Sequence, residues 1–187
     1  MPETFHFQTE RLHLRPFEHE DLPALKEYLN HPELVGRRYL PWGVPGEMPL
    51  SSQQVEVVLQ KWGEADDESH LAVELIAEPT LIGHLGFGSG WDPHNPFVEI
   101  VIAPGYQHRG YGSELLALLV RYLFMNTPAH NVSGWISDWN QAAYRFACKH
   151  GFQECGRSRR EGLRQGAYFD EIVVDLLRPE WLSNQVG

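Results

Sequence analysis

The chain has 187 residues, of which 42% are hydrophobic, and its formal net charge is -10 at pH 7. This length can bury one sizeable core and is short for two ordinary domains, so we expect a single domain over residues 1–187. The acidic charge disfavours broad electrostatic binding to nucleic acid and is compatible with a cationic amine as substrate.

The first third of the sequence predicts one strand and two helices. A strand is predicted over residues 10–17 from the alternation of apolar and polar residues. The next helix has Asp21 as its N-cap and Pro32 as its stop. After a loop rich in proline and glycine, a second helix begins at Ser51, which forms a capping box with Gln54.

The remainder of the sequence alternates between strand and helix patterns. Strands are predicted over residues 70–76, 81–88, 97–103, 132–137, 153–158 and 169–177. Helices are predicted over residues 113–126 and 140–150, with Gly151 as the C-terminal cap of the second. This order predicts an α/β fold in which helices flank one mixed sheet.

The N-terminus and the cysteines indicate where the protein resides. The first residues, MPETFHF, lack the basic start and long apolar stretch of a secretory peptide, and we therefore expect a soluble, cytoplasmic protein. Cys148 and Cys155 match neither a disulfide framework nor zinc spacing, so both are expected to be reduced thiols. The ten histidines include no HExxH motif, and no metal site is predicted.

The segment PGYQHRGYGS, residues 104–113, connects the central strand to a helix and contains no acidic residue. The first amides of a helix lack partners, and together with the helix dipole they attract phosphate. Glycines at positions 110 and 112 let a ligand approach the backbone, while His108 and Arg109 add donors. We interpret the segment as an anion-binding turn, with an ordinary tight turn as the alternative.

The spacing within this turn separates it from two other nucleotide-binding turns. The Lys and Ser/Thr of a P-loop are replaced by Tyr111 and Gly112, which disfavours nucleoside triphosphate hydrolysis. A dinucleotide fingerprint would need a glycine where Leu115 stands and an acidic residue in the next strand, which has none. A dinucleotide oxidoreductase is therefore kept only as a rival hypothesis.

The turn resembles the (Q/R)xxGx(G/A) motif of the GNAT acetyltransferase superfamily, through Gln107, Gly110 and Gly112. The stretch TERLHLRPFEHEDL is similar to that family's opening strand and helix, and WNQAAYRFACKHGF is similar to its downstream segment. The stretch GRSRREGLRQGAYFDEIVVDLLRPEW resembles the closing hairpin of the branch that includes ribosomal-protein N-terminal acetyltransferases. The resemblance covers about residues 8–182.

This resemblance implies a mostly antiparallel, twisted sheet with splayed central strands, and transfer of acetyl from acetyl-CoA to an amine. The edge of Val101 and Ile102 would pair with pantetheine. Asn140 would bond the pantetheine arm, with a plain helix N-cap as its alternative. The diphosphate of the cosubstrate would be held by the turn residues Gln107, His108, Arg109, Gly110, Tyr111, Gly112 and Ser113.

Glu99 is the candidate general base because the attacking amine must lose its proton. At neutral pH this loss costs about 4 to 5 kcal/mol for a lysine and about 1 kcal/mol for an α-amino group. Glu99 is expected on the same strand face as Val101 and Ala103, and the family often uses a carboxylate from this strand. Its alternative is a solvated or salt-bridged strand residue, because the resemblance would place the glutamate at Phe97.

The departing thiolate of CoA also needs a proton. Many family members supply it from a tyrosine seven residues after the asparagine, but that position is Ala147 here. Tyr144, one helical turn earlier, and Tyr168, on the closing hairpin, are the candidate replacements, with core packing as the alternative for Tyr144. Water could also serve, since a thiol with a pKa of ~8.5 is a fair leaving group.

The acceptor is expected to enter past residues 37–49 and 88–96, where Trp42, Trp91 and His94 could line its path. The preferred reading is an acetyltransferase of the α-amino group of a peptide or protein. A small-molecule amine as acceptor, or an acyl-CoA-binding module without turnover, are the alternatives. A monomer or homodimer is expected, and the arginine-rich residues 157–164 are expected to form a solvated turn.

Overall fold

The computed structural model describes residues 6–37, 40–41, 43–44, 46, 48–89 and 92–185. Seven strands form one sheet in the order β1-β2-β3-β4-β5-β7-β6. They are β1 (Leu12–Arg15), β2 (Glu68–Leu75), β3 (Leu81–Gly88), β4 (Phe97–Ile102), β5 (Asn131–Ser137), β6 (Gln153–Arg164) and β7 (Ala167–Leu177). All neighbouring strands pair antiparallel except β4 and β5, which confirms the predicted mixed, mostly antiparallel sheet.

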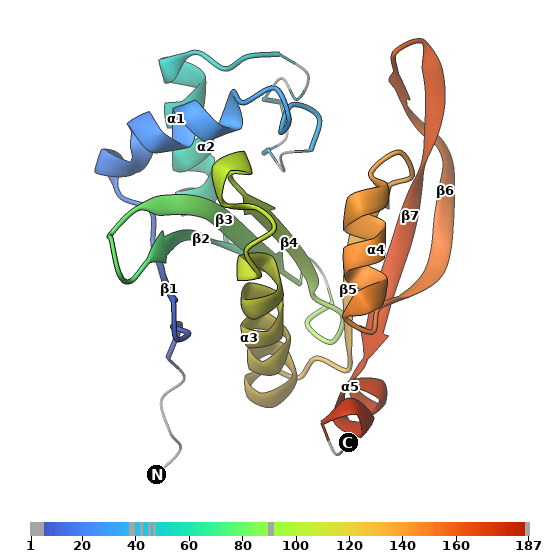
Figure 1. The fold of residues 1–187 in the computed structure, drawn as a ribbon. Coiled ribbons are helices and arrows are strands. Elements are labelled where there is room, and N and C mark those ends of the chain that lie inside the picture. Colours follow the sequence, from blue (N-terminus) through green and yellow to red (C-terminus); the bar gives the residue numbers. More distant parts are fainter. Residues whose placement is uncertain are drawn as a thin grey trace.

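Helices cover both faces of the sheet, as Figure 1 shows. They are α1 (Leu22–Leu29), α2 (Ser52–Glu64), α3 (Tyr111–Asn126), α4 (Gln141–Lys149) and α5 (Arg178–Asn184). The first two pack on one face and α3 and α4 on the other, each against its own hydrophobic cluster. The C-terminal helix α5 was not predicted. Within the described ranges, no helix combines the length and apolar character that crossing a membrane requires.

The longest helix, α3, shows how the sequence determines which side of a helix packs on the sheet. Its apolar residues recur at helical spacing, so one stripe faces the sheet and the other face meets solvent. The buried stripe consists of Leu115, Leu116, Leu119, Val120, Leu123 and Phe124. On the opposite face of the sheet, α2 buries Val55, Val58 and Trp62. The two helix layers therefore leave the sheet between them as the wall that carries the site.

The N-terminus of α2 confirms the predicted capping box. The Ser51 hydroxyl accepts a hydrogen bond from the Gln54 amide at 3.3 Å, and the Gln54 side chain accepts one from the Ser51 amide at 2.8 Å. The predicted N-cap position of α1 is confirmed, since Asp21 occupies it, but its carboxylate makes no capping hydrogen bond to the helix. It accepts instead from the Glu18 amide and from the two terminal nitrogens of Arg15.

This pairing predicts an acid-dependent loss of stability. Burial alone would raise the pKa of Asp21, but Arg15 and the Glu18 amide lower it below its ordinary value of 3.8. A lowered native pKa stabilises the fold above pH ~3.8, and the contribution disappears as pH falls through the native value. We expect Asp21→Asn to lower the free energy of unfolding by about 2 kcal/mol at pH 7 and by less at pH 3, measured by urea unfolding.

Asp66→Asn is the matched control, because Asp66 lies in an exposed bend before β2. It should change the free energy of unfolding by less than about 0.5 kcal/mol at either pH. An equal loss of stability for Asp21→Asn at pH 7 and pH 3 would contradict the ion-pair account.

The closing hairpin is longer than predicted and corrects the assignment of residues 157–164. These residues belong to strand β6 and not to a solvated turn. The reversal falls at Gln165 and Gly166, whose φ angles of 51° and 79° are typical of a type I′ hairpin turn. In Figure 1 this hairpin projects beyond the rest of the sheet, across from α1 and α2.

Candidate active site

The turn between β4 and α3 exposes a row of free backbone amides. A short 3-10 turn, Pro104–Tyr106, leads into it, and Gly110 occupies the N-cap of α3 with a left-handed φ of 86°. From His108 to Ser113, no backbone amide has a hydrogen-bond acceptor within the described part of the chain. Six consecutive free donors at the positive end of a helix dipole form an anion-binding cradle.

Gln107 has a different part in this turn from the one expected. Its backbone amide is not free, since it donates to the Pro104 carbonyl at 3.3 Å. Its side-chain amide donates to the carbonyl of Ile102 at 2.9 Å, which ties the turn to the end of β4. Gln107 therefore shapes the cradle through its side chain, and the row of free amides starts one residue later.

A cavity of about 440 Å³ opens in front of these amides. Most of the predicted turn residues line it, together with one side of α4 from its first turn to its last residue. The lining includes Ile100, Ile102, Gln107, His108, Gly110, Tyr111, Gly112, Ser113, Ala143, Phe146 and Lys149. Arg109 does not line the cavity: its guanidinium lies over the Tyr106 ring, 5.5 Å from the centroid.

Ser113 makes one further contact in the cradle. Its hydroxyl lies 2.9 Å from Nε2 of His150, at the C-cap of α4. Burial and the charge of Lys149 lower the pKa of His150, so this imidazole is neutral at pH 7. The hydroxyl contact links the start of α3 to the end of α4 across the cradle.

The strands β4 and β5 diverge beside the cradle. They share a single register pair, Phe97 with Ser133, and then separate, as the resemblance implied. The Ala103 amide donates to Ile82 on β3, so by antiparallel alternation the backbone groups of Val101 also face β3. The free edge toward the gap is therefore formed by Ile100 and Ile102, which corrects the expected Val101 contact.

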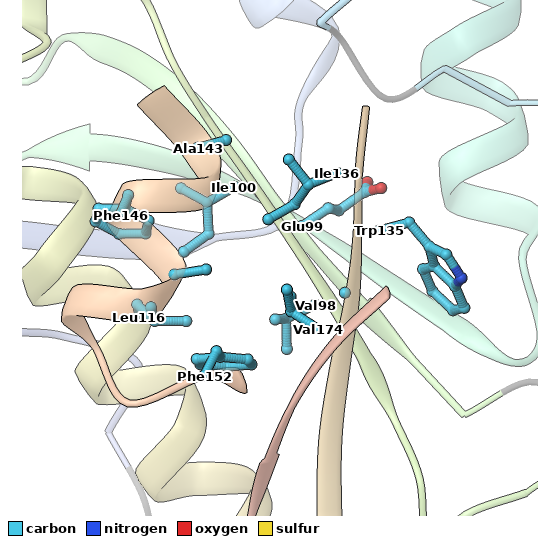
Figure 2. Close-up of a pocket in the computed structure, with 12 residues that line it drawn as sticks. Val98, Glu99, Ile100, Leu116, Trp135, Ile136, Ala143, Phe146, Phe152 and Val174 are labelled. Atoms are coloured by element: carbon cyan, nitrogen blue, oxygen red, sulfur yellow. The ribbon is translucent and has the colours of Figure 1, made fainter. Parts of the chain in front are cut away.

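The gap between β4 and β5 contains a narrow pocket of about 90 Å³. Figure 2 shows its wall, which α3, α4, β4, β5 and β7 build from apolar side chains. Glu99 is the charged residue among the described residues that line it. Ala147, at the position where the resemblance would place a tyrosine, lines the same pocket, so its small side chain leaves that corner without a proton donor.

Glu99 also borders a second cavity, of about 520 Å³, on the α2 side of the sheet. Glu99 shares this sheet face with Val101 and Ala103, as predicted, and its side chain is 10% exposed. The cavity is lined by Leu40, Pro41, Lys61, Trp62, Ala65, Asp67, Glu68, His70, Phe97 and Glu99. Among the described residues, Glu99 is thus the residue that lines both the narrow gap and the acidic, aromatic cavity.

His70 is the partner of Glu99 that the sequence did not reveal. Its Nδ1 lies 3.3 Å from Oε1 of Glu99, too misaligned for a hydrogen bond, while its Nε2 lies 3.0 Å from Oε2 of Glu68 in hydrogen-bond geometry. Burial lowers the pKa of His70, but Glu99 and Glu68 outweigh it and raise the pKa above 6.5. The imidazole also stacks on Trp62, with centroids 5.0 Å apart.

The other predicted catalytic residue, Tyr144, lies away from the gap. Its hydroxyl donates to Oε2 of Glu154 on β6 at 3.3 Å, and it lines neither the narrow pocket nor the two larger cavities. A hydrogen bond with Cys148 and the charge of Glu154 raise the pKa of its phenol. This geometry gives no support to Tyr144 as the proton donor. Tyr168 is 67% exposed at the hairpin tip.

Asn140 caps α4, since its side-chain oxygen accepts from the Ala143 amide at 3.4 Å. Its side-chain nitrogen, Nδ2, has no hydrogen bond within the described residues, so the capping role leaves a donor available for a ligand.

Of the expected acceptor-lining residues, Trp42 and Trp91 lie outside the described residues. His94 is exposed, lies 3.2 Å from Asp92 and lines none of these cavities.

Comparisons with known proteins identify the family of this chain. A family model described as an acetyltransferase (GNAT) domain matches residues 11–153. The chain belongs to the GNAT acetyltransferase family. The family expected from the sequence is therefore confirmed, and as a GNAT enzyme it transfers acetyl from acetyl-CoA to an amine.

Individual relatives agree with this assignment. The uncharacterized N-acetyltransferase YnaD of Bacillus subtilis (strain 168) is 27% identical over 176 residues, covering 94% of this chain and 99% of YnaD. A GNAT-family acetyltransferase from Bacillus anthracis is 26% identical with a TM-score of 0.76, covering 91% and 96% of the two chains. The spermidine N-acetyltransferase of Vibrio cholerae, solved with CoA and spermine, has a TM-score of 0.77 at 22% identity over 93% and 99% of the chains, and shows the shared fold.

The residues present fit the acetyl donor of this family. The six free amides and the helix dipole suit a diphosphate, and Gly112 keeps the approach open because even an added Cβ would meet only Phe146, at 3.6 Å. Among the described residues, no three His, Cys, Asp or Glu side chains are placed to bind a metal ion.

Proposed function

We propose that this GNAT enzyme acetylates the α-amino group of a peptide or protein by direct attack, with both substrates bound at once. The observation that carries this proposal is the position of Glu99, which lines both the narrow gap and the 520 Å³ cavity. An amine bound in that cavity would reach the thioester of acetyl-CoA, bound in the gap, beside Glu99. Holding both reactants in such an arrangement contributes much of the acceleration.

In this account each residue has one task. The amides from His108 to Ser113 hold the diphosphate, and the free edge of Ile100 and Ile102 aligns the pantetheine arm, which the side chain of Asn140 also bonds. Glu99 accepts a proton from the acceptor ammonium, directly or through water. Because no ionisable side chain besides Glu99 lines the gap among the described residues, water protonates the departing thiolate.

Two features support an α-amino acceptor. Deprotonating an α-amino group at neutral pH costs only about 1 kcal/mol, which suits a site whose gap is lined by one ionisable residue, Glu99, among the described residues. The β6–β7 hairpin projects beyond the rest of the sheet, across from α1 and α2 (Figure 1), and offers exposed strand residues that an acceptor chain could contact. This hairpin is also the segment that resembles the ribosomal-protein N-terminal acetyltransferase branch.

A small cationic amine is the second candidate acceptor. The cavity that Glu99 borders carries Asp67 and Glu68 as well, against one cationic side chain among the described residues, Lys61. These features favour a cationic guest, and the Vibrio cholerae neighbour is a spermidine N-acetyltransferase.

An acceptor panel separates these candidates. We expect the enzyme to release free thiol from acetyl-CoA with a peptide whose α-amino group is free, and at least about tenfold less with spermidine at equal concentration. The matched control is the same peptide with a blocked N-terminus and one internal lysine, which should react poorly. Faster turnover of spermidine than of the peptide would show that the acceptor is a polyamine. Tight CoA binding without turnover on any amine would indicate a non-catalytic module.

A further inference from the structure

Three neighbouring strands place His70, Gly86 and Glu99 in one row across the sheet. His70 on β2 pairs with Gly86 on β3, and Gly86 pairs with Glu99 on β4. A Cβ added to Gly86 would overlap the Glu99 carboxylate, so any larger residue there would displace that side chain. The glycine thus lets Glu99 reach across β3 to the imidazole, although the strands of the two residues do not touch.

The imidazole of His70 lies between two carboxylates that differ in exposure. The side chain of Glu99 is 10% exposed and that of His70 is 4% exposed, whereas that of Glu68 is 38% exposed. Nδ1 of the imidazole faces Glu99 and Nε2 faces Glu68. The three groups therefore lie in a row from the buried Glu99 carboxylate to solvent, with a hydrogen bond at the Glu68 contact and a 3.3 Å approach at the Glu99 contact. The stacked Trp62 ring holds the imidazole in the plane of that row.

We propose that His70 is a positioning residue for the acceptor chemistry: it orients the Glu99 carboxylate and relays the proton that Glu99 takes from the ammonium to Glu68 and solvent. This inference rests on the proposed function, because it needs an amine at Glu99. It adds to that function the route by which the site discharges its proton.

The proton count requires such a route. A protonated primary amine loses two protons on becoming an amide, and the new C–N bond replaces the broken C–S bond. One proton ends on the released thiol, so one must leave the site in each turnover. A carboxylate that kept this proton could not serve as base in the next turnover, whereas transfer through Nδ1 and Nε2 of His70 restores the Glu99 carboxylate.

The groups around His70 suit this transfer near neutral pH. The acidic residues Glu68 on its own strand, Glu99 on β4 and Asp67 before β2 face the same cavity, and Lys61 of α2 lines it too. The nearby His84 on β3 is fully buried, and burial together with the charge of His70 lowers its pKa to about 3. His84 is thus neutral, and a proton relay is most efficient when its pKa lies near the working pH.

The decisive variant is His70→Gln, which keeps a donor beside Glu99 but cannot titrate. In the wild type, we expect kcat at saturating substrates to rise with pH through an apparent pKa above 6.5, the ordinary value of histidine. In His70→Gln, kcat should fall about tenfold or more, this step of the profile should vanish, and the Kd for CoA should stay within about twofold. An unchanged profile would overturn the relay.

His13→Gln is the matched control. His13 also lies on a strand beside a carboxylate, 3.7 Å from Glu74, but on β1 at the far edge of the sheet. Its pH profile should match the wild type. If His13→Gln lost the same step of the profile as His70→Gln, the relay assignment would be overturned.

A measurement that does not depend on enzyme activity keeps the inference testable if His70→Gln does not fold. Titration of the His70 ring by NMR, assigned by its loss in the variant or by selective labelling, should give a pKa above 6.5 that falls in Glu99→Gln, because Glu99 raises it. No fall would overturn the contact. If the ring responds as expected but no amine is acetylated, the proposed function has failed and the His70–Glu99 contact has not.

Discussion

Replacing Gly112 with glutamate is expected to abolish binding of CoA. Gly112 is the second residue of α3 and has ordinary helical geometry, so a side chain there meets no backbone strain. A glutamate in the first turn of a helix even favours the helix dipole. The same carboxylate would project toward the free amides and repel the diphosphate, and we expect the Kd measured by calorimetry to rise at least ~100-fold, or about 2.7 kcal/mol.

Gly105→Glu is the matched control for this prediction. No atom lies within 4 Å of an added Cβ at Gly105, and this residue precedes the row of free amides. It should change the Kd for CoA by less than about threefold. Comparable affinity for CoA in Gly112→Glu and wild type would show that the diphosphate binds elsewhere.

Replacing Glu99 with glutamine should lower kcat by about 100-fold with an alkylamine acceptor of pKa ~10. Glutamine keeps the size of the side chain but cannot accept the proton. With an α-amino acceptor the loss should be about tenfold smaller, since that amine is already partly deprotonated at neutral pH. Initial rates measured across the pH range should show the variant recovering toward wild type as pH rises.

Glu56→Gln, on the exposed face of α2, serves as the control and should retain wild-type kcat. The outcome that contradicts the base assignment is an equal loss on all acceptors in Glu99→Gln, because this would indicate a damaged site and not a missing proton acceptor.

The sequence predicts the features of this protein that depend on neighbouring residues. Ser51 and Gln54 specify a helix start within four residues, and the apolar stripe of α3 specifies which face it buries. The turn at Gly110 and Gly112 is similarly local, and it identified both the cradle and the family. Asp21 shows the limit of local reasoning, because Arg15 competes successfully for the carboxylate that would cap α1.

Features that depend on strand register could not be predicted from the sequence. Whether the backbone of Val101 or of Ile102 faces the gap depends on how β4 pairs with β3, which no local pattern specifies. The contact of His70 with Glu99 needs the register of three strands, and its only sequence signal is the glycine at position 86 between them.

The closing hairpin escaped the strand pattern for another reason. Most residues of β6 are exposed, so hydrophobic alternation is absent and the strand is held by its pairing with β7. Its polar, arginine-rich sequence is therefore typical of a turn. The actual turn is only two residues long, Gln165 and Gly166, and Gly166 is its only sequence signal.

The most direct test of the account is a crystal structure of the enzyme with bound CoA. The account predicts the diphosphate on the amides from His108 to Ser113 and the sulfur atom in the gap between β4 and β5, beside the Glu99 carboxylate. A diphosphate bound away from these amides, or a sulfur atom that does not reach the gap, would contradict it.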